Sequence, residues 1–181
     1  MEFESLEIEG LVLIKPKVYY DNRGFFMETY SKKEFEEHGI KTEFVQDNHS
    51  WSIKNTLRGL HFQKEPYSQA KLIRCISGEI LDVAVDIRKN KKTFGKHVKI
   101  NLSAENKNML YIPEGFAHGF LVLSDYAEII YKVSKFYNKE YESGIIWNDP
   151  ELAIEWPVKN PILSENDRSR PRFSEIKNYL R

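Results

Sequence analysis

The sequence has no excess of either charge and almost no cysteine. Lys and Arg together number 27, and so do Asp and Glu, which gives a formal net charge of zero. With no imbalance of sign, nothing points to nucleic acid or an acidic membrane surface as a partner. The one cysteine, Cys75, cannot form a disulfide within the chain, which fits a reducing, cytoplasmic compartment. Cys75 alternates with apolar neighbours, so we expect its role to be structural.

Long hydrophobic runs are also missing. No apolar stretch approaches the roughly 18 residues that a membrane-spanning helix needs. The first residues lack the basic start and the apolar core of a secretory signal. A chain of 181 residues is most simply one domain that can bury a sizeable core. We therefore expect a soluble cytoplasmic protein, a single domain over residues 1–181, with neither a nucleic-acid partner nor a membrane partner.

Short strands account for most of the chain. In Leu81–Ile87 the apolar residues share one face and Asp82 and Asp86 point to the other, a period of two that is typical of a half-buried strand. Turn residues separate this strand from further apolar runs at 98–102, 109–112, 119–123 and 128–133, and a turn joins it to 71–77. Short strands at intervals of about 8–12 residues predict an all-β fold, a sandwich or barrel of antiparallel sheets.

Helices are expected to be few, short and peripheral. Ser31 and Glu34 form a capping-box pattern, and Gly39 can end the helix that follows, so a helix is predicted near residues 32–38. A second short helix is predicted over residues 174–180. The sequence contains no internal repeat, low-complexity tract or linker, which agrees with one compact unit.

A turn in the second half of the chain carries a histidine. In Pro113-Glu114-Gly115-Phe116-Ala117-His118, the Pro and Gly form a tight turn that places His118 at the start of the next strand. This arrangement resembles the second sequence motif of the cupin superfamily, which implies a small jelly-roll barrel. Metal-binding cupins also have a His-x-His cluster, but the matching stretch here is His61-Phe62-Gln63. Two histidines fall short of the three protein ligands typical of catalytic metal sites, so we expect no metal.

His61 lies among cationic residues. Arg58 and Lys71 are on the same or neighbouring predicted strands, and two cations near one imidazole favour its neutral, basic form. Such cations cost desolvation energy unless they meet an anion, which mobile carboxylates or a pyrophosphate could supply. An isolated buried histidine is most often structural, but this setting favours an acid–base role. From the residues alone, Lys71 could bind phosphate, Tyr131 could be an ordinary strand aromatic, and Asp167 could be a solvated turn residue.

Nine stretches, spread over nearly the whole chain, together form one pattern. They are Asp21–Glu28, Phe44–Ser50, Leu57–Gln63, Gln69–Lys71, Leu81–Arg88, Pro113–His118, Tyr131–Lys132, Asn148–Pro150 and Leu163–Asp167. In order and spacing they resemble the dTDP-4-dehydrorhamnose 3,5-epimerase family, a metal-free branch of the cupin superfamily. The resemblance implies an isomerase without cofactors in dTDP-L-rhamnose biosynthesis. Such an enzyme inverts carbons 3 and 5 of dTDP-4-keto-6-deoxy-D-glucose and gives dTDP-4-keto-L-rhamnose.

The resemblance also implies the catalytic groups. His61 would be the base that removes a proton beside the ketone, and Asp167 would fix its ring and tautomer. Lys71 would stabilise the enolate oxygen that develops. Tyr131 would deliver a proton to the opposite face of the sugar ring, so His61 and Tyr131 should lie on opposite walls of the site.

Substrate-binding residues follow from the same resemblance. Arg23 and Arg58 suit the pyrophosphate, because a guanidinium binds such oxygens in pairs. Gln46 and Asn48 lie two apart on a predicted strand, so both would face the nucleotide or the sugar. The remaining candidates are Phe25 and Tyr137 for base stacking, Glu28 and Glu142 as hydrogen-bond acceptors, His118 for a sugar hydroxyl or water, and Arg168.

A homodimer is implied in the same way. In this family the N-terminal segment crosses to a second subunit, so Arg23 and Glu28 would complete the partner's site. Two other functions stay open. One is an enzyme that inverts a single carbon or acts on another nucleotide-linked 4-ketosugar. The other is a non-catalytic or metal-dependent cupin that binds a sugar nucleotide, which a stoichiometric transition metal in the purified protein would favour.

Overall fold

Short strands and a few short helices follow one another along the chain, and the computed structural model describes residues 1–178 and 180. The strands are β1 (Glu2–Ser5), β2 (Val12–Lys15), β3 (Val18–Asp21), β4 (Gly24–Met27), β5 (Gln46–Ile53), β6 (Leu57–Gln63), β7 (Lys71–Ser77), β8 (Glu79–Asp86), β9 (His97–Ser103), β10 (Met109–Ile112), β11 (Phe116–Val122), β12 (Tyr126–Val133) and β13 (Glu142–Gly144). The helices are α1 (Lys32–Glu37), the 3-10 turn η1 (Lys139–Tyr141), α2 (Glu165–Arg168) and α3 (Phe173–Ile176).

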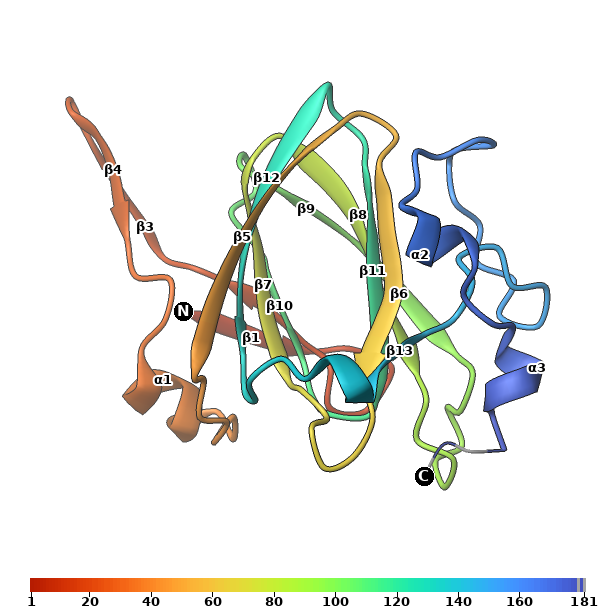
Figure 1. The fold of residues 1–181 in the computed structure, drawn as a ribbon. Helices are drawn as coiled ribbons and strands as arrows, with labels where there is room; N and C mark the ends of the chain where they lie inside the picture. The colour runs from red at the N-terminus through yellow and green to blue at the C-terminus, as the bar shows by residue number, and fades with distance from the viewer. Residues whose placement is uncertain (179, 181) are drawn as a thin grey trace.

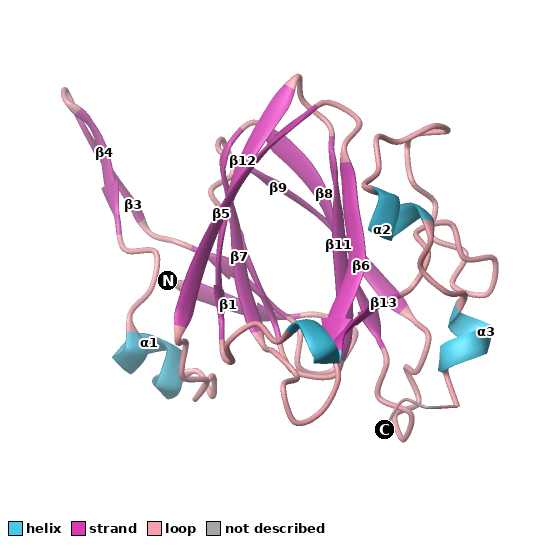
Figure 2. Cartoon of the chain, viewed as in Figure 1, coloured by secondary structure: helices cyan, strands magenta, loops and turns pink. Residues whose placement is uncertain are grey.

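Two antiparallel sheets face each other and form the barrel (Figure 1). One sheet has six strands in the order β1-β2-β10-β7-β12-β5, and the other has five in the order β13-β6-β11-β8-β9. Figure 2 shows the short helices outside this barrel. The all-β jelly-roll barrel with peripheral helices is therefore confirmed, and the limits predicted for β7 and β10 match the structure.

The helices differ in detail from the prediction. Ser31 is the N-cap residue of α1, but its side chain makes no capping hydrogen bond. The Glu34 carboxylate is instead paired with the N-terminal ammonium of Met1. The second helix begins and ends earlier than predicted, since α3 covers Phe173–Ile176, and residue 179 of the predicted range lies outside the described residues.

Strand β8 is buried on both faces, so the prediction of a half-buried strand was wrong. Val83 and Val85 pack against the C-terminal segment, the part of the chain that follows β13, in a cluster that includes Leu152 and Phe173. The opposite face of β8 points into the barrel, and both of its aspartates are fully buried. A period of two was read correctly, but it could not show that the C-terminal segment covers the outer face.

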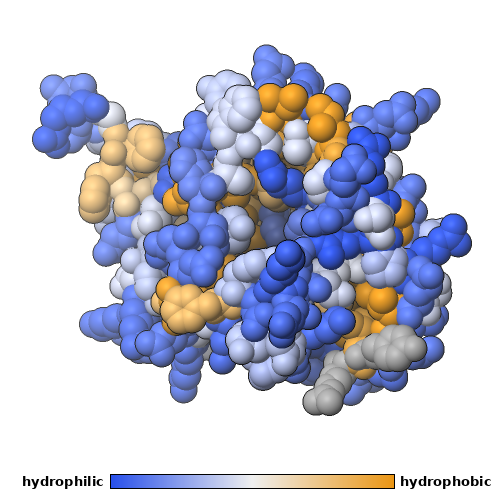
Figure 3. Space-filling view, in the orientation of Figure 1, coloured by the Kyte–Doolittle hydropathy of each residue, from blue (hydrophilic) through white to orange (hydrophobic). Residues whose placement is uncertain are grey.

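A hairpin of β3 and β4 projects from the barrel (Figure 1). Its aromatic side chains are largely exposed: Tyr19, Tyr20, Phe25 and Phe26 keep between 53% and 70% of their surface accessible. Figure 3 shows hydrophobic residues gathered on this arm. Among the described residues, no helix is both long and apolar enough to cross a membrane.

Candidate active site

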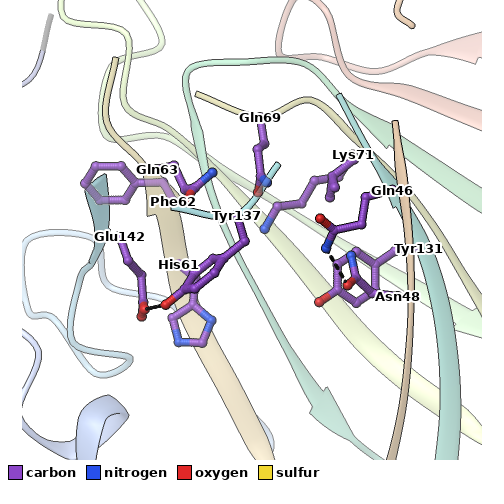
Figure 4. A pocket seen from close by; sticks show the side chains of 11 residues that line it. Gln46, Asn48, His61, Phe62, Gln63, Gln69, Lys71, Tyr131, Tyr137 and Glu142 are labelled. Carbon is purple, nitrogen blue, oxygen red and sulfur yellow. Dashed lines mark hydrogen bonds between the residues drawn. The ribbon is translucent and has the colours of Figure 1, made fainter. Parts of the chain in front are cut away.

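The mouth of the barrel holds a pocket of about 370 Å³, where the surface is hollowed in Figure 3. Side chains from β5, β6, β7, β12 and β13 line it, so both sheets contribute (Figure 4). The pocket brings together the predicted site residues Gln46, Asn48, His61, Lys71, Tyr131, Tyr137 and Glu142.

His61 has a carboxylate partner on the C-terminal segment. Its Nε2 lies 2.5 Å from Asp167 Oδ1, and the Asp167 side chain is only 4% exposed. Ser164 Oγ donates to the other carboxylate oxygen at 2.9 Å. Burial alone would raise the pKa of Asp167, but the hydrogen bond and charge of His61, together with the Ser164 bond, hold that pKa below its ordinary value. Asp167 is therefore ionised at neutral pH and leaves Nδ1 of His61 as the nitrogen available for base chemistry.

The segment 162–173 carries Asp167 to His61, although 106 residues separate the two in sequence. Backbone hydrogen bonds fix the start of this segment beside β6 and its end beside the residues after β13. The buried carboxylate of Asp149 adds a further anchor, because it accepts a hydrogen bond from Phe173 N at 2.8 Å. The segment is therefore held at both ends, with Asp167 between them.

Tyr131 faces the pocket from the other sheet. His61 is on β6 and Tyr131 is on β12, strands of opposite sheets, and Figure 4 shows their side chains on two sides of the pocket. Burial raises the pKa of Tyr131 above its ordinary value, and the charge of Arg58 partly opposes this rise. The phenol therefore keeps its proton at neutral pH, and it stands opposite the imidazole, as a base and an acid on two faces of one substrate require.

Lys71 extends from β7 into the same pocket (Figure 4). Desolvation lowers its pKa to about 8, and the negative charge of Asp82 works against that change. Lys71 is thus mostly an ammonium at pH 7 and loses its charge when the pH rises through about 8.

His118 lies deeper than the sequence predicted and is not among the residues that line the pocket. It is 9% exposed, and its Nε2 lies 2.8 Å from Oδ2 of the fully buried Asp82. Burial lowers the pKa of His118, while Asp82 opposes this. Within the described part of the chain, Asp82 Oδ1 has no hydrogen-bond partner. A contact between His118 and a sugar hydroxyl stays a prediction.

Gln63 occupies the position at which metal-binding cupins have their second histidine, and its amide is fully engaged with backbone. Nε2 donates to Tyr67 O at 3.0 Å and to Phe136 O at 3.3 Å, while Oε1 accepts from Asn138 N at 2.7 Å. The bonds with Phe136 and Asn138 fix the chain on both sides of Tyr137. Gln63 therefore holds an aromatic residue of the pocket rim in place.

Glu142 joins the pocket rim to the C-terminal segment. Tyr137 Oη donates to Glu142 Oε2 at 2.6 Å, and Arg170 forms an ion pair with the other carboxylate oxygen. These two donors hold the pKa of Glu142 below its ordinary value, the Tyr137 hydrogen bond contributing most. On the opposite wall of the pocket, Gln46 Nε2 donates to Asn48 Oδ1 at 2.9 Å. The two side-chain amides therefore form one continuous polar surface on that wall.

Besides Asp167 and His118, five predicted residues are not among those that line this pocket. Arg58 donates through Nε to Ser52 Oγ at 3.0 Å. Arg23, Phe25 and Glu28 lie on or beside the projecting hairpin, where Arg23 pairs with Asp21 and keeps 84% of its side chain exposed. Arg168 is exposed on α2. Arg58 lies on the same strand as His61, and its charge acts on Tyr131. The binding roles of all five residues stay predictions.

Sequence reasoning missed three residues of the site. Ser164 could have been found, because Ser164 and Asp167 have the spacing of a helix cap, and Ser164 Oγ does accept from Asp167 N. Asp82 was assigned to the face of β8 away from the apolar residues, without recognising that this face is the barrel interior. Arg170 gave no signal, since only the folded segment brings it to Glu142.

The chain is similar to known proteins over nearly its whole length. A family model described as dTDP-4-dehydrorhamnose 3,5-epimerase matches residues 5–175. The dTDP-4-dehydrorhamnose 3,5-epimerase of Shigella flexneri is 58% identical over 181 residues, which cover 99% of this chain and 100% of the relative.

Solved structures give the same result. The dTDP-6-deoxy-D-glucose-3,5-epimerase of Legionella pneumophila, in complex with dTDP-4-keto-L-rhamnose, superposes with a TM-score of 0.95 and 45% identity, covering 99% of this chain and 96% of the other. A 3'-monoepimerase from Streptomyces bikiniensis, in complex with dTDP-quinovose, has a TM-score of 0.90 and 32% identity, with 96% and 89% covered. The chain belongs to the dTDP-4-dehydrorhamnose 3,5-epimerase family.

Proposed function

We propose that this protein is an isomerase that inverts carbons 3 and 5 of dTDP-4-keto-6-deoxy-D-glucose and yields dTDP-4-keto-L-rhamnose. One observation carries the proposal: the carboxylate-bound imidazole of His61 faces the phenol of Tyr131 across the pocket, and Lys71 reaches into the same space. The family match supplies the substrate class.

The chemistry follows from the opposed groups. His61 takes the proton from a carbon beside the ketone, while Asp167 holds the ring and stabilises the imidazolium that forms. The Lys71 ammonium stabilises the enolate oxygen, where negative charge develops. Tyr131 then gives its proton to the other face of the same carbon, which inverts it. His61 then releases its proton and the Tyr131 phenolate takes one up, both by exchange with solvent. Repetition at the second flanking carbon completes the reaction, and these steps involve no cofactor.

The product distinguishes this function from its nearest alternative. A 3'-monoepimerase shares the fold at 32% identity, so inversion of one carbon is the second candidate. We expect purified protein to convert dTDP-4-keto-6-deoxy-D-glucose into a product whose NMR couplings show both carbons inverted. A product with one inverted carbon would show that the protein is a monoepimerase. Unchanged substrate would contradict both functions.

The charge state of Lys71 gives a pH dependence. Because its pKa is lowered to about 8, kcat/KM of the free enzyme should fall as the pH rises through about 8, well below the raised pKa of Tyr131. In Lys71→Arg the cation persists above pH 12, so the remaining activity should lack this fall. A wild-type profile that stays flat to about pH 9, roughly one unit beyond the lysine titration, would contradict the role of Lys71.

The working unit in this proposal is a homodimer in the cytoplasm. The projecting hairpin exposes Tyr20 and Phe26 by 70% and 67%, and a second copy would cover such aromatics in a symmetric, reciprocal contact. Arg23, Phe25 and Glu28 would then reach the partner's pocket and contact the nucleotide or its phosphates. The nucleobase would stack on Tyr137, and Gln46, Asn48 and Arg58 would bind the rest of the substrate, with Arg168 and His118 as further candidates.

Mixing two inactive variants tests whether the site is shared. In a heterodimer of His61→Ala and Arg23→Ala, one site receives its own intact His61 and the intact Arg23 of the other subunit. Random exchange of subunits should therefore restore about a quarter of wild-type activity. The matched control mixes His61→Ala with Tyr131→Phe, which act in the same subunit, and should restore no epimerisation. No recovery in the first mixture, or a fully active monomer in sedimentation, would contradict the shared site.

A further inference from the structure

Arg170 links the segment that carries Asp167 to the rim of the pocket. It lies three residues after Asp167, and its side chain is 15% exposed. Its Nη2 donates to Glu142 Oε1, while Glu142 Oε2 accepts from the hydroxyl of Tyr137 at 2.6 Å. One carboxylate therefore ties the C-terminal segment to an aromatic residue that lines the pocket.

The strand next to His61 is shaped to admit the Arg170 side chain. Gly144 on β13 is paired with His61 on β6. A Cβ at Gly144 would lie 2.9 Å from both Cδ and Nε of Arg170, and 2.5 Å from the carbonyl oxygen of Leu60. Only glycine leaves this space, so the arginine lies directly against the backbone beside the imidazole. Its Nε is buried and has no hydrogen-bond partner among the described residues.

The guanidinium also acts on the carboxylates around it. Burial raises the pKa of Asp167, whereas His61 and Ser164 lower it, and the Arg170 charge lowers it further by a smaller amount. The same charge contributes to lowering the pKa of Glu142 as well. Arg170 thus stands between the acid that orients His61 and the acid that holds Tyr137, without itself lining the pocket.

We propose that Arg170 is a positioning residue for the proposed epimerase: by binding Glu142 it fixes the 162–173 segment, and so holds Asp167 on His61 and Tyr137 at the rim. The inference rests on the proposed function for its effect on turnover, but the contact between Asp167 and His61 can be measured in the free protein.

The pH midpoint of the His61 titration can be measured by NMR in the free protein. The direction in which a variant shifts this midpoint tests the proposal. Among the described residues, the charged or titratable groups around this ring include Asp167, Glu142, Arg170, His118, Lys71, Tyr131 and Tyr137. Removing the Arg170 charge alone would move the midpoint upward, because a nearby cation disfavours the imidazolium. Loss of the Asp167 contact would move it downward, toward the midpoint measured in Asp167→Asn.

We expect Arg170→Gln to move the midpoint downward and to lower kcat by about 10–100-fold, the usual cost of losing an orienting partner. Arg172→Gln, which changes an exposed arginine in the same segment, should match wild type in both. Glu142→Gln removes the same ion pair from the other side, and the double variant should lose little beyond the larger single loss, because both act through one bond.

An unchanged or upward midpoint in folded Arg170→Gln, with kcat retained, would overturn the proposal. If Arg170→Gln does not fold, the same outcomes in Arg170→Met, which removes the same charge, decide it. If the midpoint moves downward in Arg170→Gln but wild-type protein does not epimerise the proposed substrate, the positioning role stands and the proposed function is contradicted.

Discussion

His61→Ala is expected to lose both epimerisation and hydrogen exchange beside the ketone. Among the described residues that line the pocket, His61 has the only imidazole, and it is the group that Asp167 orients at 2.5 Å. General base catalysis typically contributes about 10²–10⁴-fold, and the neighbouring Glu142 carboxylate is already engaged by Tyr137 and Arg170. Exchange in deuterated water, measured by NMR, reports enolate formation directly, and inversion of the carbons reports the whole reaction.

Two further variants make this result specific. His61→Asn preserves polarity and approximate size, so it should be as inactive as the alanine variant if the proton transfer is what matters. His38→Ala removes an exposed histidine at the end of α1, far from the pocket, and should exchange and epimerise like wild type. Exchange that survives in His61→Ala would show that another group is the base.

Tyr131→Phe is expected to separate exchange from inversion. The variant keeps His61, Asp167 and Lys71, so the enolate can still form and protons beside the ketone should continue to exchange at a measurable rate. Inversion should fall by about 10²–10⁴-fold, because the phenol that protonates the opposite face is missing. Following deuterium content and product stereochemistry in one NMR time course measures both effects.

A matched control for this variant lies on the same strand. Tyr126→Phe removes only a hydroxyl from an exposed tyrosine at the other end of β12, and it should invert both carbons at the wild-type rate. Inversion at a near wild-type rate in Tyr131→Phe would show that another group supplies the proton.

Much of the barrel could be predicted because local pattern decides it. The limits of β7 and β10 followed from their apolar runs and the adjoining turns. The tetrad of His61, Lys71, Tyr131 and Asp167 could not be assembled from spacing alone, because Asp167 reaches His61 only through a folded segment held at its two ends. Resemblance to a family named those residues, and the structure then placed them around one pocket.

The remaining errors arose where tertiary contacts outweigh local pattern. Alternation put Asp82 and Asp86 on one face of β8, but only the folded chain shows that this face is the barrel interior and that the other is covered. For Gln63 the sequence predicted only that an amide replaces the second histidine of metal-binding cupins. Its hydrogen bonds with Phe136 and Asn138, on either side of Tyr137, join residues distant in sequence. Such contacts leave no periodic signal in the sequence.

The location of deuterium in the product tests the central claim most directly. Wild-type protein is incubated with dTDP-4-keto-6-deoxy-D-glucose in deuterated water, and the product is assigned by NMR. The proposed mechanism predicts deuterium at both inverted carbons, because each loses its proton to His61 and receives one from Tyr131, whose hydroxyl exchanges with solvent. Inversion with the original hydrogen retained at either carbon would contradict proton transfer between opposite walls of the pocket.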